Sequence, residues 1–152
     1  MSQKYNQAKR KFAIKNDTGE LVELGQFLRD AFKGILSIKR EWFVLFDENG
    51  KYMRTQETLP YGVKPKYRTP DLIIFKKTER TNSSIIMEKP LFCLEDDGSI
   101  HHVHVEDTLN RNEDYKNAEI DLVIVDKPNI KVSIFDEAFS KCETLIKQKL
   151  GN

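Results

Sequence analysis

Short turns made of Asp, Asn and Gly separate the apolar segments of this chain, and they constrain its fold more than any other feature. The clearest is DENG at residues 47–50, between EWFVLF and KYMRT, while NDTG at 16–19 and DDG at 96–98 also separate strand-like runs. Asp, Asn and Gly readily adopt the backbone conformations of tight hairpin turns. Strands joined by hairpins run antiparallel, so the sequence predicts a mostly antiparallel sheet built from hairpins.

Two segments instead carry apolar residues at helical spacing. In residues 24–35 apolar side chains recur every three or four positions, which predicts an amphipathic helix that covers the sheet. In residues 138–150 a second apolar stripe follows Ser133 and Asp136, whose spacing is typical of a helix N-terminal capping box. We therefore expect an α+β fold with one helix inserted early and one C-terminal helix packed on the sheet.

Length and composition fit one globular domain. Of the 152 residues, 39% are apolar and 32% are charged, and no repeat or linker divides the chain. We expect a single domain over residues 1–152, with a basic N-terminal arm at about 1–11 and a proline-rich loop at about 59–70. No apolar stretch has the length of a membrane helix or a secretory signal, so we expect a cytoplasmic protein without a membrane partner. Glycine-rich Walker and Rossmann phosphate loops are also absent from the sequence.

Positive and negative charges are unevenly distributed along the chain. Residues 1–90 hold 18 Lys and Arg against 11 Asp and Glu, whereas residues 91–152 hold 7 against 13. If the fold keeps these parts separate, the surface is electrically polarised. We therefore expect a non-catalytic interaction domain without a cofactor, which binds a protein partner, further copies of itself or nucleic acid. The candidate binding residues are Lys9, Arg10, Lys11, Lys64, Lys66 and Arg68 for phosphate or acidic groups, and Tyr67 for stacking on bases.

A cluster of three histidines in IHHVHVED, residues 100–107, offers an alternative. On a strand, His102 and His104 would share one face, and Asp107 could add a carboxylate ligand. Such a set could hold zinc or manganese and activate a bound water molecule. A half-exposed polar strand followed by an acidic loop explains the same residues, and we take this as the prediction.

A second alternative centre begins at TPDLIIF and continues, after a spacer, with SIIMEKP. These segments resemble the core of PD-(D/E)xK nucleases, in which an Asp that opens one strand and a Glu-x-Lys on the next hold magnesium and orient water. The resemblance implies a magnesium- or manganese-dependent nuclease with Asp71, Glu88 and Lys89 as catalytic residues. The match is degenerate: with Lys89 as the family's lysine, its metal-binding glutamate position falls on Met87. Glu20 or Glu23, near the first helix, could contribute another carboxylate.

Overall fold

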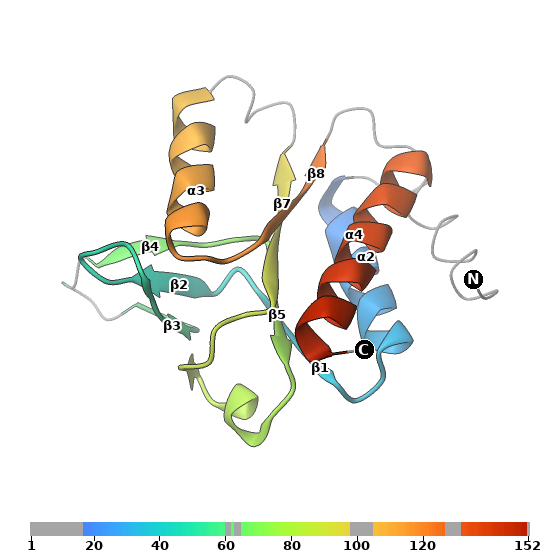
Figure 1. Cartoon of the computed structure of the whole chain (residues 1–152), viewed down its shortest axis with the longest axis horizontal. Coiled ribbons are helices and arrows are strands. Elements are labelled where there is room, and N and C mark those ends of the chain that lie inside the picture. Colours follow the sequence, from blue (N-terminus) through green and yellow to red (C-terminus); the bar gives the residue numbers. More distant parts are fainter. Residues whose placement is uncertain (1–16, 60–61, 63–64, 98–104, 127–131, 152) are drawn as a thin grey trace.

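The computed structural model describes residues 17–59, 62, 65–97, 105–126 and 132–151 (Figure 1). In these ranges the chain forms two four-stranded sheets, three α-helices and one short 3-10 helix, which confirms the predicted α+β class with an early and a C-terminal helix. In chain order the elements are α2 (Asp17–Ala31), β1 (Leu36–Arg40), β2 (Phe43–Phe46), β3 (Tyr52–Gln56), β4 (Lys66–Arg68), β5 (Leu72–Lys76), η1 (Glu79–Asn82), β6 (Ile85–Ile86), β7 (Phe92–Asp97), α3 (Val105–Asn117), β8 (Leu122–Asp126) and α4 (Val132–Leu150).

The strands form two sheets, which we call sheet A and sheet B. Sheet A has the order β1-β5-β7-β8, and sheet B has the order β4-β2-β3-β6. Every pair is antiparallel except β7 and β8, which run parallel. Helix α3 lies between these two strands in the chain, and parallel neighbours require such a crossover connection. The sheets are therefore mostly antiparallel, as predicted, with one parallel edge strand.

The chain passes between the two sheets at short junctions. Between β1 and β2 it turns at Glu41, which has the positive φ of 58° that non-glycine residues seldom adopt. It returns from sheet B to sheet A between β4 and β5, where Pro70 is buried and Asp71 follows it. The backbone carbonyl of Asp71 accepts a hydrogen bond of 3.2 Å from the Glu41 N–H, so the two junctions are tied together.

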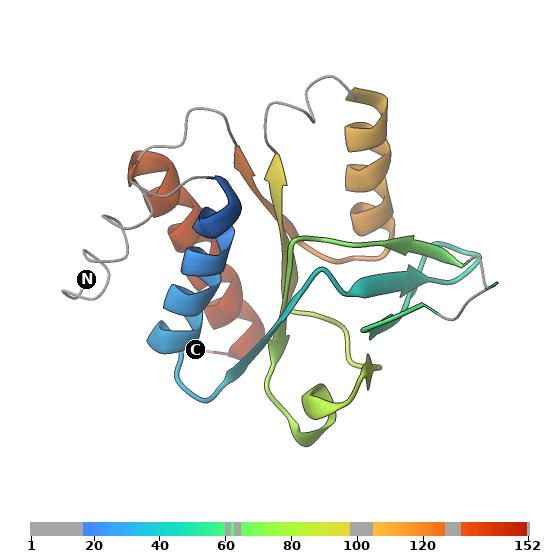
Figure 2. The same ribbon diagram turned by 180° about the vertical axis from the view of Figure 1, so that it is seen from behind.

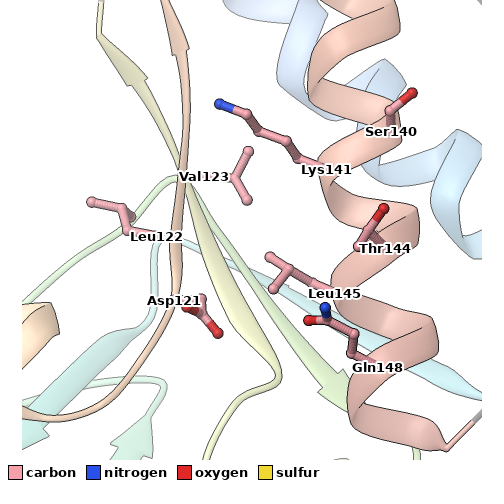
Figure 3. A pocket seen from close by; sticks show the side chains of 8 residues that line it. All are labelled: Asp121, Leu122, Val123, Ser140, Lys141, Thr144, Leu145 and Gln148. Carbon is pink, nitrogen blue, oxygen red and sulfur yellow. The ribbon is translucent and has the colours of Figure 1, made fainter.

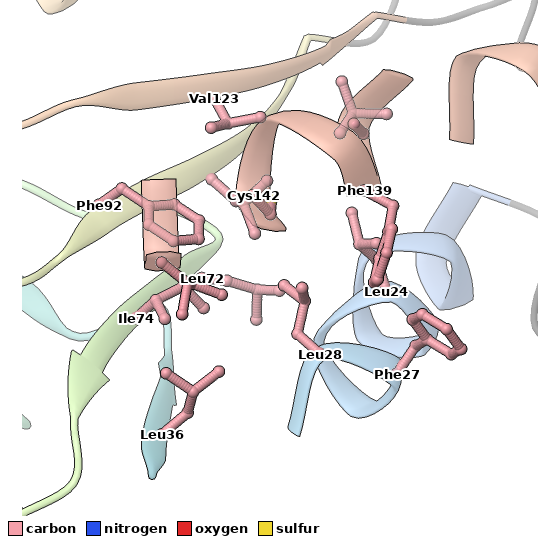
Figure 4. Packing of buried hydrophobic residues seen from close by; sticks show 14 residues of the cluster. Leu24, Phe27, Leu28, Leu36, Leu72, Ile74, Phe92, Val123, Phe139 and Cys142 are labelled. Carbon is pink, nitrogen blue, oxygen red and sulfur yellow. The ribbon is translucent and has the colours of Figure 1, made fainter. Parts of the chain in front are cut away.

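Helices α2 and α4 lie side by side on one face of sheet A (Figures 1 and 2). They bury a cluster of apolar side chains against the strands, with Phe27 of α2 and Phe139 of α4 at its outer end (Figure 4). The two rings meet edge to face with their centroids 4.6 Å apart. Burial of these apolar faces is the main force that holds both helices on the sheet.

The other face of sheet A packs against sheet B and α3 (Figure 2). This second cluster contains Ile73 and Phe75 of β5, Cys93 of β7, Tyr115 of α3 and Phe46 of β2. Since side chains alternate along a strand, residues 71 and 95 belong to the same face of the sheet as Ile73 and Cys93. The side chains of residues 71 and 95 therefore lie on the face of sheet A that packs against sheet B and α3.

The predicted DENG hairpin is confirmed. Asp47 and Lys51 close the turn with a backbone hydrogen bond of 2.8 Å, and the Asp47 carboxylate accepts from the Asn49 and Lys51 N–H groups. Gly50 has a φ of 82°, a value that costs glycine little. This turn therefore forms from its local sequence.

Two other sequence predictions are wrong. The run after NDTG is helical, because α2 already begins at Asp17 and the helical spacing that buries Leu24 and Leu28 continues to its end. The predicted polar loop NRNEDYKN forms the second half of α3. Its helix buries one narrow face through Arg111 and Tyr115, which are four positions apart.

None of the helices in the described part of the chain is long and apolar enough to cross a membrane.

Candidate functional site

Asp71 and Glu95 form a pair of acidic side chains on neighbouring strands. In the β5–β7 register Leu72 lies opposite Leu94, so Asp71 and Glu95 are the next opposed positions. Their side chains are joined by a hydrogen bond, and Glu95 also bonds to the Asp71 backbone. Only 16% of the Glu95 side chain is exposed. The pair therefore brings two carboxyl groups together where water has little access.

The pKa of Glu95 is raised from 4.5 to about 8, chiefly by burial and also by the neighbouring Asp71 carboxyl, against the opposing effect of Arg111. The causes are those expected for two acids in one poorly solvated site, where both cannot ionise easily. A direct hydrogen bond between two carboxyl groups also needs a proton. At neutral pH Glu95 is therefore protonated and can donate this hydrogen bond to Asp71.

Arg111 of α3 provides a cation beside this pair. Its side chain is 6% exposed, and its Nη1 lies 3.8 Å from Glu95 Oε2. The Nε and Nη2 groups donate to Asn112 Oδ1 at 3.2 and 2.9 Å, which orients the guanidinium. A buried guanidinium near one negative charge keeps the site close to electrical neutrality.

The predicted binding residues of β4 are ion-paired with α3. Asp114 Oδ1 lies 3.1 Å from Lys66 Nζ, and Asp114 Oδ2 accepts from Arg68 Nε at 2.8 Å. Basic and acidic segments thus adjoin here rather than forming separate surfaces. Tyr67 is 43% exposed and packs edge to face on Phe43, on the opposite side of β4 from its two basic neighbours. The remaining predicted cations, Lys9, Arg10, Lys11 and Lys64, lie outside the described residues.

Glu88 and Lys89 lie between β6 and β7, and both have partners other than Asp71. Glu88 Oε1 accepts from Arg80 Nη1 at 2.9 Å, while Lys89 Nζ is 4.0 Å from Glu119 Oε2. The sequence resemblance assumed one continuous strand through this segment, but the chain leaves β6 after Ile86, and β7 begins only at Phe92. The acid that this strand places opposite Asp71 is therefore Glu95. Glu95, which directly follows the apolar run LFCL at 91–94, was the signal in the sequence that could have indicated it.

The side chains of the predicted histidine site lie outside the part of the chain that the structure describes. His102 and His104 lie outside the described residues; Asp107 is part of the α3 backbone, and its side chain is likewise not described. Among the side chains that the structure does describe, no three or more His, Cys, Asp or Glu gather in an arrangement that could hold a metal ion.

Two buried polar groups, the Cys93 thiol and the Tyr115 hydroxyl, lie in the apolar cluster between sheet A and α3. Cys93 lies two residues before Glu95, and burial holds the pKa of its thiol well above the ordinary value, so it stays protonated. Cys142 lies in the other apolar cluster, and burial raises the pKa of its thiol to about 12, so this thiol also stays protonated. The hydroxyl of Tyr115 is buried and has no hydrogen-bond partner among the described residues. Neither thiol is suited to nucleophilic attack.

A groove of about 470 Å³ lies elsewhere, between the edge strand β8 and helix α4 (Figure 3). Val123 and Leu145 form its floor, and Lys141 and Thr144 line one side. Its lining includes neither Asp71 nor a histidine or cysteine. The groove is therefore separate from the acidic pair and presents no comparable chemistry.

No family model matches this chain, and no curated protein or solved structure does either. Its function is therefore inferred from its own residues.

Proposed function

We propose that this chain is a divalent-metal-dependent enzyme that hydrolyses phosphodiester bonds in nucleic acid, with Asp71 and Glu95 as metal ligands. The observation that carries the proposal is the acidic pair itself. Two carboxyl groups from adjacent strands are hydrogen-bonded to each other in a largely buried position. Burying two acids together is unfavourable for folding, and groups with strongly shifted pKa values of this kind are concentrated at functional sites.

The arrangement supports the PD-(D/E)xK resemblance with a different second acid. Pro70 and Asp71 open β5, and Glu95 takes the position on the next strand that the sequence had suggested for Glu88. One departure remains, because the family has a lysine two residues beyond this acid and the chain has Asp97. In the proposed site Arg111, from α3, supplies the cation beside Glu95 instead.

The donor set fits magnesium or manganese. These hard cations prefer oxygen ligands, and magnesium is commonly bound by one or two carboxylates together with water and substrate phosphates. A cation would replace the proton that Asp71 and Glu95 share, so its affinity should rise as the pH approaches 8. Once bound, the ion would lower the pKa of a coordinated water molecule and polarise a phosphoryl oxygen.

Nucleic acid is the proposed substrate because a cationic strand precedes the site. Lys66 and Arg68 share the single carboxylate of Asp114, so this cluster keeps a net positive charge. Half of the Lys66 side chain is exposed, and Arg68 is only three residues from Asp71. Positive charge so close to Asp71 in the sequence suits binding of the phosphate backbone of a polynucleotide.

Calorimetric titration of the chain with Mn²⁺ and Mg²⁺ at pH 6.0 and pH 8.5 tests the metal site directly. We expect binding at the higher pH, weakening at least tenfold at the lower pH because protons compete for the carboxylates. Asp71→Asn and Glu95→Gln should each abolish it. Glu88→Gln is the matched control: it also removes one carboxylate, but that carboxylate is paired with Arg80.

Cleavage of labelled single- and double-stranded DNA and RNA tests the reaction. We expect cleavage only with the metal ion and not in the Asp71→Asn or Glu95→Gln variants. A wild-type chain that binds neither ion would refute the proposal. Retention of nucleic acid without cleavage, with or without metal, would instead favour the non-catalytic interaction domain.

A further inference from the structure

Tyr115 has a buried hydroxyl group that the packing of its ring does not explain. The residue is 1% exposed, and its ring packs edge to face on Phe46 with the centroids 6.2 Å apart. Its hydroxyl has no hydrogen-bond partner among the described residues. Phenylalanine would fill the same space, and buried hydroxyls in folded proteins nearly always have a partner. The hydroxyl is therefore available to donate a hydrogen bond to a bound group.

The surroundings of Tyr115 connect it with the acidic pair. Tyr115 and Arg111 are four residues apart on α3, so their side chains lie on the same face of the helix. Cys93 of β7 packs in the same apolar cluster as Tyr115, and Glu95, two residues further along the same face of β7, lies 3.8 Å from Arg111. Burial, the largest effect, holds its pKa far above the ordinary value for tyrosine. The Tyr115 hydroxyl is therefore protonated at neutral pH, so it can donate a hydrogen bond but cannot act as a base.

The end of α3 fixes the position of Tyr115. The Ile120 N–H donates to the Tyr115 carbonyl at 2.9 Å, and the Glu119 N–H donates to the Lys116 carbonyl at 3.0 Å. These two bonds form a Schellman motif, and Ile120 packs in the same apolar cluster as Tyr115. Because the helix end is held in this way, the hydroxyl has a defined place at the inner wall of the site.

We propose that Tyr115 is a positioning residue, whose hydroxyl donates a hydrogen bond to a water molecule held beside Glu95 and orients it toward the substrate. The inference rests on the proposed function for the role of that water in hydrolysis. Arg111, on the same face of α3 as Tyr115, and Glu95, which lies 3.8 Å from it, are polar groups with which a water molecule in this region could also form hydrogen bonds. These polar groups favour water over an apolar group as the partner of the hydroxyl.

Tyr115→Phe tests the role, and Tyr52→Phe is its matched control. The Tyr52 hydroxyl is already engaged, donating to the carbonyls of Ile86 at 3.1 Å and Glu88 at 2.9 Å. We expect Tyr115→Phe to lower kcat on the order of 10- to 100-fold, with KM and the Kd for Mn²⁺ changed less than twofold. Its urea midpoint should fall no more than that of Tyr52→Phe, because each change removes one hydrogen-bonding hydroxyl. Tyr52→Phe should lower the midpoint without this selective loss of kcat.

Raman spectroscopy gives a readout that does not depend on activity. The tyrosine doublet in the wild-type minus Tyr115→Phe difference spectrum reports whether the Tyr115 hydroxyl is hydrogen-bonded. We expect the signature of a donor. A non-bonded signature, or an unchanged kcat in Tyr115→Phe, would overturn the inference even if the wild type binds Mn²⁺ and cleaves. A wild-type chain without metal binding or cleavage would refute the proposed function and the positioning role with it, while the Raman signature would still decide whether the hydroxyl holds water.

Discussion

Replacing Glu95 by glutamine should change how the stability of the chain depends on pH. The unfolded chain loses the Glu95 proton near pH 4.5, whereas the folded chain keeps it to about pH 8. Between these values the folded state holds one more proton than the unfolded state. Linkage then requires the free energy of unfolding to fall as the pH rises through this window, and to be unaffected by Glu95 outside it.

The magnitude follows from the two pKa values. A full proton difference gives a slope of about 1.4 kcal/mol per pH unit. Over the window from 4.5 to about 8 the decrease would approach about 5 kcal/mol for an isolated carboxyl, and the coupling to Asp71 makes this an upper limit. Glutamine has the shape of glutamic acid and can donate its amide hydrogen to Asp71, so Glu95→Gln keeps the hydrogen bond without the titration.

Urea denaturation at intervals between pH 5 and pH 9 measures the effect. The two proteins should have similar free energies of unfolding near pH 5, and the variant should become progressively more stable than the wild type up to about pH 8. Taking the difference between the two curves cancels the titration of groups that do not interact with Glu95. Parallel curves over the whole range would refute the assignment of a raised pKa to Glu95.

Two further predictions concern the fold. Phe139→Ala should lower the free energy of unfolding in urea by about 3–5 kcal/mol, because it removes a ring that is 2% exposed and packed on Phe27; Leu109→Ala, at a position 62% exposed, should change it by less than about 0.5 kcal/mol. Glu119→Gly should stabilise the fold by about 0.5 kcal/mol and so raise the melting temperature slightly. The φ of Glu119 is 59°, a value that glycine adopts without strain. The same change at the exposed helical residue Glu137 should destabilise by about 1 kcal/mol, and a loss of stability in both variants would contradict the strain at position 119.

The fold class could be predicted because its signals are local, but some local signals were ambiguous. DENG forms a hairpin, whereas Asp17 and Gly19 in NDTG lie in the first turn of a helix. Turn-forming residues are common at helix starts as well, so only the spacing of the following apolar residues distinguishes the two. Helix α3 was missed for a different reason. Its buried face consists of an arginine and a tyrosine among charged residues, which gives little apolar periodicity.

The site shows where sequence reasoning reaches its limit. Asp71 could be named as a candidate from the sequence because Pro-Asp before an apolar run is a local pattern. Its partner depends on where the next strand begins and on the register between β5 and β7, which tertiary packing sets. The break at residues 87–91 moves the partner from Glu88 to Glu95. The uneven charge along the sequence also did not transfer to the structure at β4, because Asp114 pairs with both of its cations.

The acidic pair connects stability with the proposed chemistry. Above about pH 8 an ionised Glu95 beside Asp71, in a site with little access to water, destabilises the folded state, and Arg111 offsets this in part. A divalent cation bound between Asp71 and Glu95 would remove that repulsion and bind only the folded chain. At a concentration 100 times its Kd it would add about 2.7 kcal/mol of stability. Mn²⁺ should therefore raise the urea midpoint of the wild type at pH 8.5, much less at pH 6, and not at all in Glu95→Gln. If the ion stabilised the variant equally, it would be binding elsewhere, and the acidic pair would have to be understood as a structural hydrogen bond rather than a metal site.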